Sequence, residues 1–477
     1  MYKAEKPVQT TFEDFNRSCG MKLDVRDEWI AVANSIDWAA VEEKYMEFFP
    51  SKRGRPALNA RMALGALIMQ HRAKLSDRDP VKGVARNPHC QYFIGLESCR
   101  TKCPFGHGVH PGLRRRFGMD FINEINEVVV RNAKPTAEHA DDTGEEPSAG
   151  GNLGTTILDA TCSPSNMRFP QDFPLLNEAR ERLDGMVDRL HAMVDGPRRP
   201  RTCRKVLRKA HLAMARSKRR PAKKMRPPVR AMPCAVKRNM AFADSYLAKG
   251  LVPADKRDVR SLDAVRRLYA QQKEMSDAKK HGGPDRIVGT TQPSVRPTVR
   301  GKAKAPVEFG AKYGVGVDGN WHARLEKASF DACSECTVFK DAVERYKERT
   351  GCHPKRVLAD RAYRAKGNRA YCEGRGIEMS GRKPGGPPKD GRERRKAERG
   401  DDVDRIEVER FFSRGKRCFG AGLVMTKLSD TTLGSIALAV LVANLFGTGL
   451  SFFAFYFVDA PGGWASFDLM EVQSDAA

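Results

Sequence analysis

Acidic residues are scarce relative to basic ones in this chain of 477 residues. It has 59 Asp and Glu against 85 Lys and Arg, which gives a formal net charge of +26. Such a chain disfavours cationic partners and attracts polyanions, through Coulomb attraction and the release of counterions. Basicity also keeps proteins soluble. Nucleic acid is nevertheless the partner that we expect.

Several other features are missing. The twelve cysteines are scattered singly, which is unlike a small disulfide-stapled secreted domain and favours a reducing compartment. Residues 1–27 carry charges and lack an apolar core, so they do not form a secretory signal peptide. Neither a Gly-rich phosphate loop nor a histidine-activated nucleophile is apparent. We expect a cytoplasmic, nucleoid-associated protein with no ATP or other small-molecule substrate.

Charge is also missing from residues 431–458, a run long enough to be considered as a membrane span. Asn444 and the Gly447-Thr448-Gly449 break interrupt it, which favours a buried helix, a turn and a second apolar piece. We therefore expect a hydrophobic C-terminal tail over residues 431–477 and no membrane insertion. A membrane-tethered nucleic-acid binder is the weaker alternative.

Helical periodicity dominates the N-terminal region, for which we expect a domain over residues 1–131. In Ala60–Lys74 apolar residues recur at spacings near 3.6, and Asn59 is positioned to cap that helix. Just upstream, Arg53 and Arg55 lie in a short basic turn suited to phosphate contacts. The domain could recognise DNA ends, or equally serve dimerisation or packing, because helical periodicity specifies no groove contact.

Residues 132–153 are polar, rich in Gly, Pro and acids, and predict a linker. A second domain is expected over residues 154–430, with a basic helical insertion at about 174–300. No acid occurs between Asp195 and Asp244. Because like charges repel, this stretch suits a DNA clamp, with Arg219 and Lys224 among its contacts, better than a solvated face.

The elements outside the insertion alternate between strand and helix. Before the insertion, a short strand ends on Asp159. After it we expect a hairpin over Phe309–Ala328, a helix at 334–349, a strand at 356–359, a helix to residue 375, a strand at 377–379 and a last helix from about 403. This order predicts a mixed α/β sheet covered by helices.

Three acidic residues are candidates for catalysis. Asp159 and Asp360 each follow an apolar β-run, although an aspartate at a strand end more often makes a turn or caps a helix. Arg405, Glu409 and Lys416 fall within roughly 40° of one another on a helix, so they share one face. An exposed helix with favourable charge spacing is the alternative interpretation.

Converging carboxylates repel one another unless cations neutralise them, so three acids at one point favour a metal site. Ligand sets made only of oxygen suit Mg²⁺ or Mn²⁺. Two such ions about 3.5 to 4 Å apart activate a nucleophile and stabilise the leaving 3′ oxygen in phosphodiester chemistry. Arg405 and Lys416 would then contact DNA phosphates beside Glu409.

Motifs along nearly the whole chain resemble one family, the DDE transposases of the IS-five group of insertion sequences. The matching segments are Gly54–Pro56, Arg61–Leu67, Leu75–Arg78, Gln91–Leu96, Asp159–Thr161, Arg168–Asp172, Pro306–Lys312, Ala359–Tyr363, and Arg405, Glu409 and Lys416 in an Arg-x₃-Glu-x₆-Lys pattern.

The resemblance implies an RNase H-like catalytic core in which Asp159, Asp360 and Glu409 form the catalytic triad and bind two Mg²⁺ ions. It also implies cleavage at terminal inverted repeats by water, followed by attack of the freed 3′-OH on target DNA. Tyr363, within the Asp360 motif, is a further candidate DNA contact, and synapsis of two ends makes a homodimer reasonable.

Two positions depart from the family pattern. Asp402 stands where the signature has Tyr, and Arg410 where the family commonly has Gly. A catalytically silent DNA-binding protein derived from a transposase is therefore the alternative function. A zinc site formed by Cys99, Cys103, His107 and His110 is not expected, because structural sites usually separate their ligand pairs by a longer loop.

Overall fold

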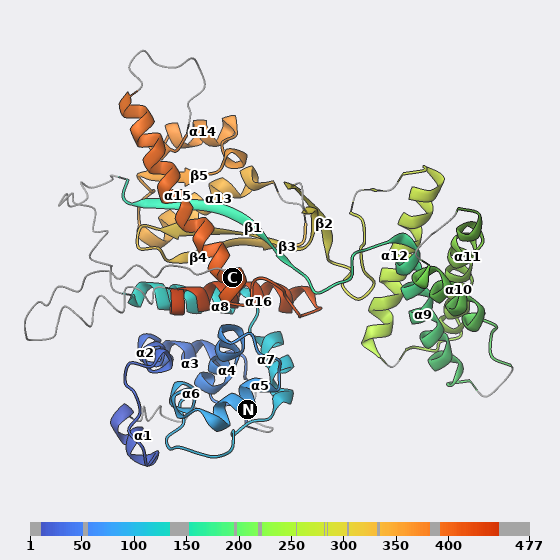
Figure 1. Cartoon of the computed structure of the whole chain (residues 1–477), viewed down its shortest axis with the longest axis horizontal. Coiled ribbons are helices and arrows are strands. Elements are labelled where there is room, and N and C mark those ends of the chain that lie inside the picture. The colour runs from blue at the N-terminus through green and yellow to red at the C-terminus, as the bar shows by residue number, and fades with distance from the viewer. Residues whose placement is uncertain are drawn as a thin grey trace, which may run out of the picture.

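The computed structural model shows a helical N-terminal region, a mixed sheet and a helical insert (Figure 1). It describes residues 11–50, 56–133, 152–194, 198–217, 222–253, 255–280, 282–283, 285–302, 305–331, 334–381 and 392–447. Most of the predicted linker, and Arg53, Arg55 and Arg219, lie outside these residues.

The N-terminal region consists of short helices packed around aromatic and aliphatic side chains. They are α1 (Phe12–Ser18), α2 (Glu28–Ser35), α3 (Trp38–Met46), α4 (Ala60–Arg72), α5 (Asp79–Arg86), α6 (Pro88–Phe93), η1 (His107–Val109), α7 (His110–Arg116) and α8 (Met119–Asn132). As predicted, Asn59 caps α4, its side chain accepting from the Arg61 N–H. The periodic residues Leu64, Leu67 and Ile68 are buried, so their spacing correctly indicated the inward face.

The sheet is mixed, as predicted. Its strands are β1 (Thr155–Pro164), β2 (Arg296–Lys302), β3 (Ala305–Asp318), β4 (Ala323–Ser329), β5 (Arg356–Ala359) and β6 (Glu378–Met379). The order is β2-β3-β1-β5-β6, and β4 also pairs with β3. β1 is antiparallel to β3 and parallel to β5, and β5 is parallel to β6.

β1 is longer than predicted, because it continues past Asp159 to Pro164. Beyond the end of β5 it stays paired with β3, for example Thr161 with Tyr313 and Pro164 with Gly310. Gly310 permits this pairing, since a Cβ at that position would lie 2.0 Å from the Ser163 carbonyl oxygen. Asp159 therefore lies inside a strand, at the point where its parallel neighbour stops.

Helices cover both faces of the sheet. They are η3 (Arg361–Tyr363), α13 (Glu335–Thr350), α14 (Lys366–Glu373), α15 (Arg392–Cys418) and α16 (Ser429–Gly447). Leu158 and Ala359 belong to the same hydrophobic cluster as Phe339 of α13. Ile157 and Leu358, their strand neighbours, belong to the cluster that contains α15 and α16 residues. Because side chains alternate along a strand, α13 and α15 lie on opposite faces.

The apolar C-terminal segment forms a buried helix, as its sequence favoured, and because this helix belongs to the core, the tail that we assigned does not begin at residue 431. α16 lies between the N-terminal helices and the sheet (Figure 1), packed against α8, β4 and α4. It is long and apolar enough to cross a membrane, but 72% of its apolar window is buried inside the protein. Asn444, which we expected to interrupt the run, lies inside α16 and bonds with Ala323 and Asn126. Residues 448–477 lie outside the described part.

Four helices occupy the region where a basic insertion was expected: α9 (Asp172–His191), α10 (Arg204–Arg216), α11 (Ala222–Leu247) and α12 (Lys256–Asp277). They surround a hydrophobic cluster of their own that includes Leu183, Val236 and Val265. The insert lies to one side of the sheet and joins it through β1 and β2 (Figure 1). β2 was not predicted and begins at Arg296, within the range assigned to the insertion.

Candidate catalytic and DNA-binding site

Asp159 and Asp360 lie next to each other because of one strand pairing. Leu158 of β1 is the partner of Ala359 of β5 in the parallel register, so each aspartate is the next residue of a neighbouring chain segment. Adjacent strands are about 4.7 to 4.9 Å apart. Both aspartates follow residues that face α13, so the alternation of strand side chains directs them to the α15 face.

The two carboxylates are held by local backbone groups. Asp159 Oδ1 accepts a hydrogen bond of 2.7 Å from the Ala160 N–H, and Asp360 Oδ1 one of 2.6 Å from the Arg361 N–H. The second is the helix-cap contact that an aspartate at a strand end was expected to make. Each carboxylate retains oxygen lone pairs for another partner.

Charge at this point is poorly balanced. Burial raises the pKa of Asp159 to about 6, and the negative charges of Asp360 and Glu335 act in the same direction. Arg405 on α15 opposes them, with its Nη2 3.5 Å from Asp360 Oδ1. The arrangement therefore favours additional positive charge beside Asp159.

α15 presents one face along β1. Arg405, Glu409, Phe412 and Lys416 fall within about 60° of one another on this helix. Phe412 packs edge-on against Tyr313 with ring centroids 5.6 Å apart. The Lys416 Nζ donates to Thr161 Oγ1 at 2.8 Å.

Glu409 lies on this face between two anchored positions. Thr161 is two residues beyond Asp159 and so points to the same side of β1. The helix face thus contacts Asp360 through Arg405 and β1 at Thr161 through Lys416. Glu409 is one helical turn after Arg405 and is exposed.

The structure brings together two of the three predicted carboxylates. Among the described residues, no group of three or more His, Cys, Asp or Glu is close enough to hold a metal ion. The part that Glu409 plays in the triad stays a prediction. Asp159 and Asp360 do fit a cation, because they are paired oxygen donors and the Asp159 pKa is raised by burial and by like charge.

Tyr363 requires a correction. It is only 4% exposed, lies in the cluster beneath α13 with Phe339, and burial raises the pKa of its phenol. A DNA phosphate cannot reach a side chain in this position. The backbone of Lys224 is in α11, but its side chain is outside the described part, so the predicted DNA contacts of Arg53, Arg55, Arg219 and Lys224 stay predictions.

Sequence reasoning missed a positioning residue next to Asp360. The Arg364 guanidinium donates two hydrogen bonds to the Ala359 carbonyl, from Nε at 3.0 Å and from Nη2 at 2.8 Å. It thereby holds the end of β5, one residue before Asp360. The only available signal was its place four residues after Asp360, which does not indicate where the side chain turns.

A second missed feature is the ion pair between Lys312 of β3 and Glu335 at the first position of α13, at 2.7 Å. Glu335 contributes to the raised pKa of Asp159. In the sequence Glu335 stands between Cys333 and Cys336, a local context that gives no signal of this contact. Tertiary packing of α13 against η3 brings it close.

Two families of known proteins match parts of this chain. The family described as "Transposase DDE domain" matches residues 357–446, which contain Asp360 and Glu409. The family described as "Transposase domain (DUF772)" matches residues 18–107, within the N-terminal helices. Together these matches support an insertion-sequence transposase, and such proteins bind DNA. The mixed α/β architecture is consistent with a DDE transposase.

Among individual proteins, the chain is similar to "Uncharacterized protein ORF8 in nfe locus" from Rhizobium meliloti. The two are 26% identical over 161 residues, which is 34% of this chain and 73% of the relative. No solved structure matches.

Proposed function

We propose that this protein is a DDE transposase of an insertion sequence of the IS-five group, which cleaves DNA at terminal inverted repeats and transfers the freed strand into target DNA. The observation that carries the proposal is that Asp159, in β1, and Asp360, directly after the parallel strand β5, lie side by side and face the helix that bears Glu409. The two transposase family matches support the same assignment.

The fold that we propose for the catalytic domain is RNase H-like. An antiparallel β4-β3-β1 unit followed by parallel β5 and β6 supports this assignment, as does a helix on each face. The insert enters after β1 and leaves before β2. In this arrangement the chain can carry extra helices without interrupting the contact between β1 and β5.

Asp159, Asp360 and Glu409 would hold two divalent ions, Mg²⁺ or Mn²⁺. When bound, such ions activate a water or 3′-OH nucleophile and stabilise the leaving oxygen. The raised pKa of Asp159 supports this role, because a carboxylate pushed toward neutrality by burial and by a like charge gains most from a cation. Glu409 would have to approach the two aspartates for the three carboxylates to bind the same ions.

The remaining residues of the site would bind DNA or hold the residues that orient it. Arg405, now beside Asp360, could exchange this contact for a phosphate when cations occupy the carboxylates. Lys416 is one of the predicted phosphate contacts, and its bond to Thr161 sets its position along β1. Arg364 fixes the carbonyl that precedes Asp360. These residues position the reacting phosphodiester and supply no nucleophile themselves.

The test is a nicking assay with Mg²⁺ on duplex DNA taken from the sequences that flank the gene. Short matching inverted repeats on both sides would identify the substrate. We expect Asp159→Asn, Asp360→Asn and Glu409→Gln each to abolish nicking while retaining DNA binding. Glu407→Gln is the matched control, because Glu407 is on α15 and pairs with Arg410 on the helix itself. Nicking by Asp360→Asn at the native rate would reject the triad.

The second candidate is a catalytically silent DNA-binding protein. Asp402 and Arg410, at positions where the family pattern has Tyr and Gly, favour it, as does the ion pair between Arg405 and Asp360. It predicts binding to the same duplex with no nicking by the native chain. We also propose that the protein acts in the cytoplasm, on the nucleoid, as a homodimer that joins two element ends.

A further inference from the structure

A hollow lies where β1 leads into the helical insert. Its volume is about 390 Å³, and it is lined by residues 166–171, by α9, by His211 of α10, by the segment before β2 and by Lys427. It is separate from Asp159, which is several residues earlier in β1. The catalytic proposal gives this hollow no role.

Phe169 forms an aromatic platform at the hollow. Its side chain is 68% exposed, although phenylalanine is usually buried. The ring is nevertheless held in place, edge-on to Phe309 with centroids 5.5 Å apart. A fixed ring with a free face is suited to stack on another planar group, as aromatic side chains do with nucleobases.

Polar groups in the hollow can form hydrogen bonds with the edge of such a planar group. Gln292 is 5% exposed, and its Nε2 donates to the Thr426 carbonyl, but its buried Oε1 has no hydrogen-bond partner among the residues that the structure describes. A buried acceptor without a donor costs free energy until a ligand supplies one. The lining contains the cationic residues Arg168 and Lys427 and the acidic residues Glu178 and Glu181. The two glutamates are already paired, Glu178 with Arg182 and Glu181 with Arg180.

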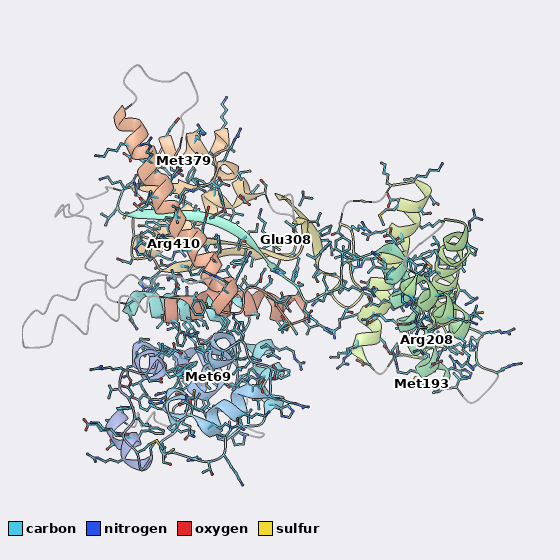
Figure 2. All side chains as sticks on the ribbon, viewed as in Figure 1. Met69, Met193, Arg208, Glu308, Met379 and Arg410 are labelled. Atoms are coloured by element: carbon cyan, nitrogen blue, oxygen red, sulfur yellow. The ribbon has the colours of Figure 1, made fainter. Side chains whose placement is uncertain are left out.

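α10 extends the positive charge outward from the hollow. Lys205, Arg208, Lys209 and Arg216 lie on its exposed side, and Arg208 is labelled on the insert in Figure 2. Within the described part of the chain, none of these four side chains forms an ion pair or hydrogen bond. Other insert arginines do, for example in the pairs Arg182–Glu178, Arg189–Asp258, Arg204–Asp188, Arg267–Asp263 and Arg286–Asp172.

We propose that this hollow and the cationic side of α10 together bind a segment of DNA with an unpaired nucleotide. The base stacks on Phe169 and donates to Gln292 Oε1, while the flanking phosphates lie along Lys205, Arg208, Lys209 and Arg216. His211 belongs both to α10 and to the hollow, and so joins the two parts. This inference rests on the proposed action on DNA, but it needs neither the triad nor a metal ion.

The experiment measures binding of a 20-nucleotide single strand, of its perfect duplex and of the same strand made with abasic sites, by the full chain in EDTA. Because base–aromatic stacking contributes about 1–3 kcal/mol per base, Phe169→Ala should weaken single-strand binding about tenfold. Duplex and abasic-strand binding should change less than twofold, and Phe169→Trp should retain single-strand binding. Val206→Ala, at an exposed apolar residue of α10, is the control.

The α10 contacts have a separate readout in salt dependence. Each phosphate contact to a single strand contributes about 0.7 to the slope of log K against log salt. The double variant Arg208→Gln with Lys209→Gln should therefore lower the slope by about 1.4. The control is Arg266→Gln with Arg267→Gln on α12, which should leave the slope unchanged because Arg266 is already paired with Asp244 and Arg267 with Asp263.

Equal losses on single strand, duplex and abasic strand, or no loss with Phe169→Ala, would overturn the base pocket. Equal slopes for the two double variants would overturn the phosphate track. The triad is tested by nicking, so Asp360→Asn should retain single-strand binding, and failure of either proposal can be distinguished from failure of the other.

Discussion

Leu158 and Ala359 are register partners in neighbouring parallel strands, and this pairing sets Asp159 and Asp360 side by side. The relationship is one of backbone geometry, so it depends on whatever stabilises the ends of these strands and the contacts between the sheet and the helices.

Arg364 should affect catalysis without contacting DNA. Arg364→Gln removes both hydrogen bonds to the Ala359 carbonyl and frees the residue before Asp360. Misplacing a reacting group by about 1 Å can cost about a hundredfold in rate, so we expect nicking to fall at least tenfold with duplex affinity unchanged. Lys366→Gln, at an exposed residue nearby, is the control; equal rates for the two variants would contradict the positioning role.

The end of β1 should not tolerate a side chain at Gly310. A Cβ there would lie 2.0 Å from the Ser163 oxygen, so the β1–β3 pairing would have to separate. We expect Gly310→Ala to lower the free energy of unfolding by about 3 kcal/mol in urea denaturation. Gly319→Ala, where a Cβ meets nothing within 4 Å, should change it by less than about 1 kcal/mol.

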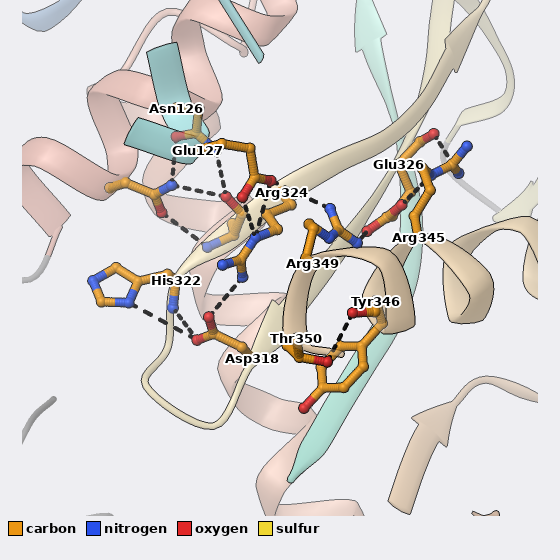
Figure 3. A network of polar contacts seen from close by, with 12 residues as sticks. Asn126, Glu127, Asp318, His322, Arg324, Glu326, Arg345, Tyr346, Arg349 and Thr350 are labelled. Atoms are coloured by element: carbon orange, nitrogen blue, oxygen red, sulfur yellow. Dashed lines mark hydrogen bonds and ion pairs between the residues drawn. The ribbon is translucent and has the colours of Figure 1, made fainter. Parts of the chain in front are cut away.

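A buried carboxylate connects the sheet to α13 and, indirectly, to α8. Glu326 of β4, with its side chain 4% exposed, is held by Arg345 at 2.8 Å and Arg349 at 2.6 Å (Figure 3). Arg349 also contacts Glu127 of α8 at 3.4 Å.

Glu326→Gln should leave Arg345 without its carboxylate and Arg349 with Glu127 alone, and lower the free energy of unfolding by about 1.5–3 kcal/mol. Asp263→Asn removes the exposed partner of Arg267, and a change of less than about 1 kcal/mol is expected there. Similar values for the two variants in chemical denaturation would show that the Glu326 cluster is not stabilising.

His71 should make the protein sensitive to mild acid. It bonds to Ser435 of α16 through Nε2 at 3.2 Å, and burial lowers its pKa from 6.5 to about 4. Between these values the unfolded chain binds a proton that the folded chain does not. Stability is therefore complete above pH 6.5 and falls as the pH decreases toward 4, by up to about 3 kcal/mol.

His71→Gln should reduce this loss between pH 7 and pH 4.5 by about 2 kcal/mol, as measured by denaturation at each pH. His107→Gln alters an exposed histidine of the same region and should retain the native pH profile. An unchanged profile in His71→Gln would assign the acid sensitivity to other groups.

Local patterns predicted the elements whose signals are local. Asn59 capped its helix, and residues 356–359 formed the expected strand. The sequence pattern failed to predict the bounds of elements that are determined by strand pairing or tertiary packing. Cys162-Ser163-Pro164 has no strand signature but continues β1 because β3 holds it, and the charged residues 392–402 look like a loop but extend α15.

The candidate site was predictable in its residue types and less so in its geometry. Spacing placed Arg405, Glu409 and Lys416 on one helix face, whereas the pairing of Asp159 with Asp360 depends on strand register, which tertiary packing sets. The predicted DNA contact of Tyr363 was wrong, because a sequence motif specifies the identity of a residue and not its burial. Arg364 and Glu335 were missed because their partners lie across tertiary contacts.

α16 has a consequence for how the protein is made. This helix fills the space between the N-terminal helices and the sheet, yet the ribosome adds it after every other element that the structure describes. Until then the apolar sides of α8 and β4 lack their cover. A stop codon between Glu409 and Ser429 would therefore release a chain with all of its candidate catalytic acids and an open core, which is a substrate for aggregation and for cellular proteases.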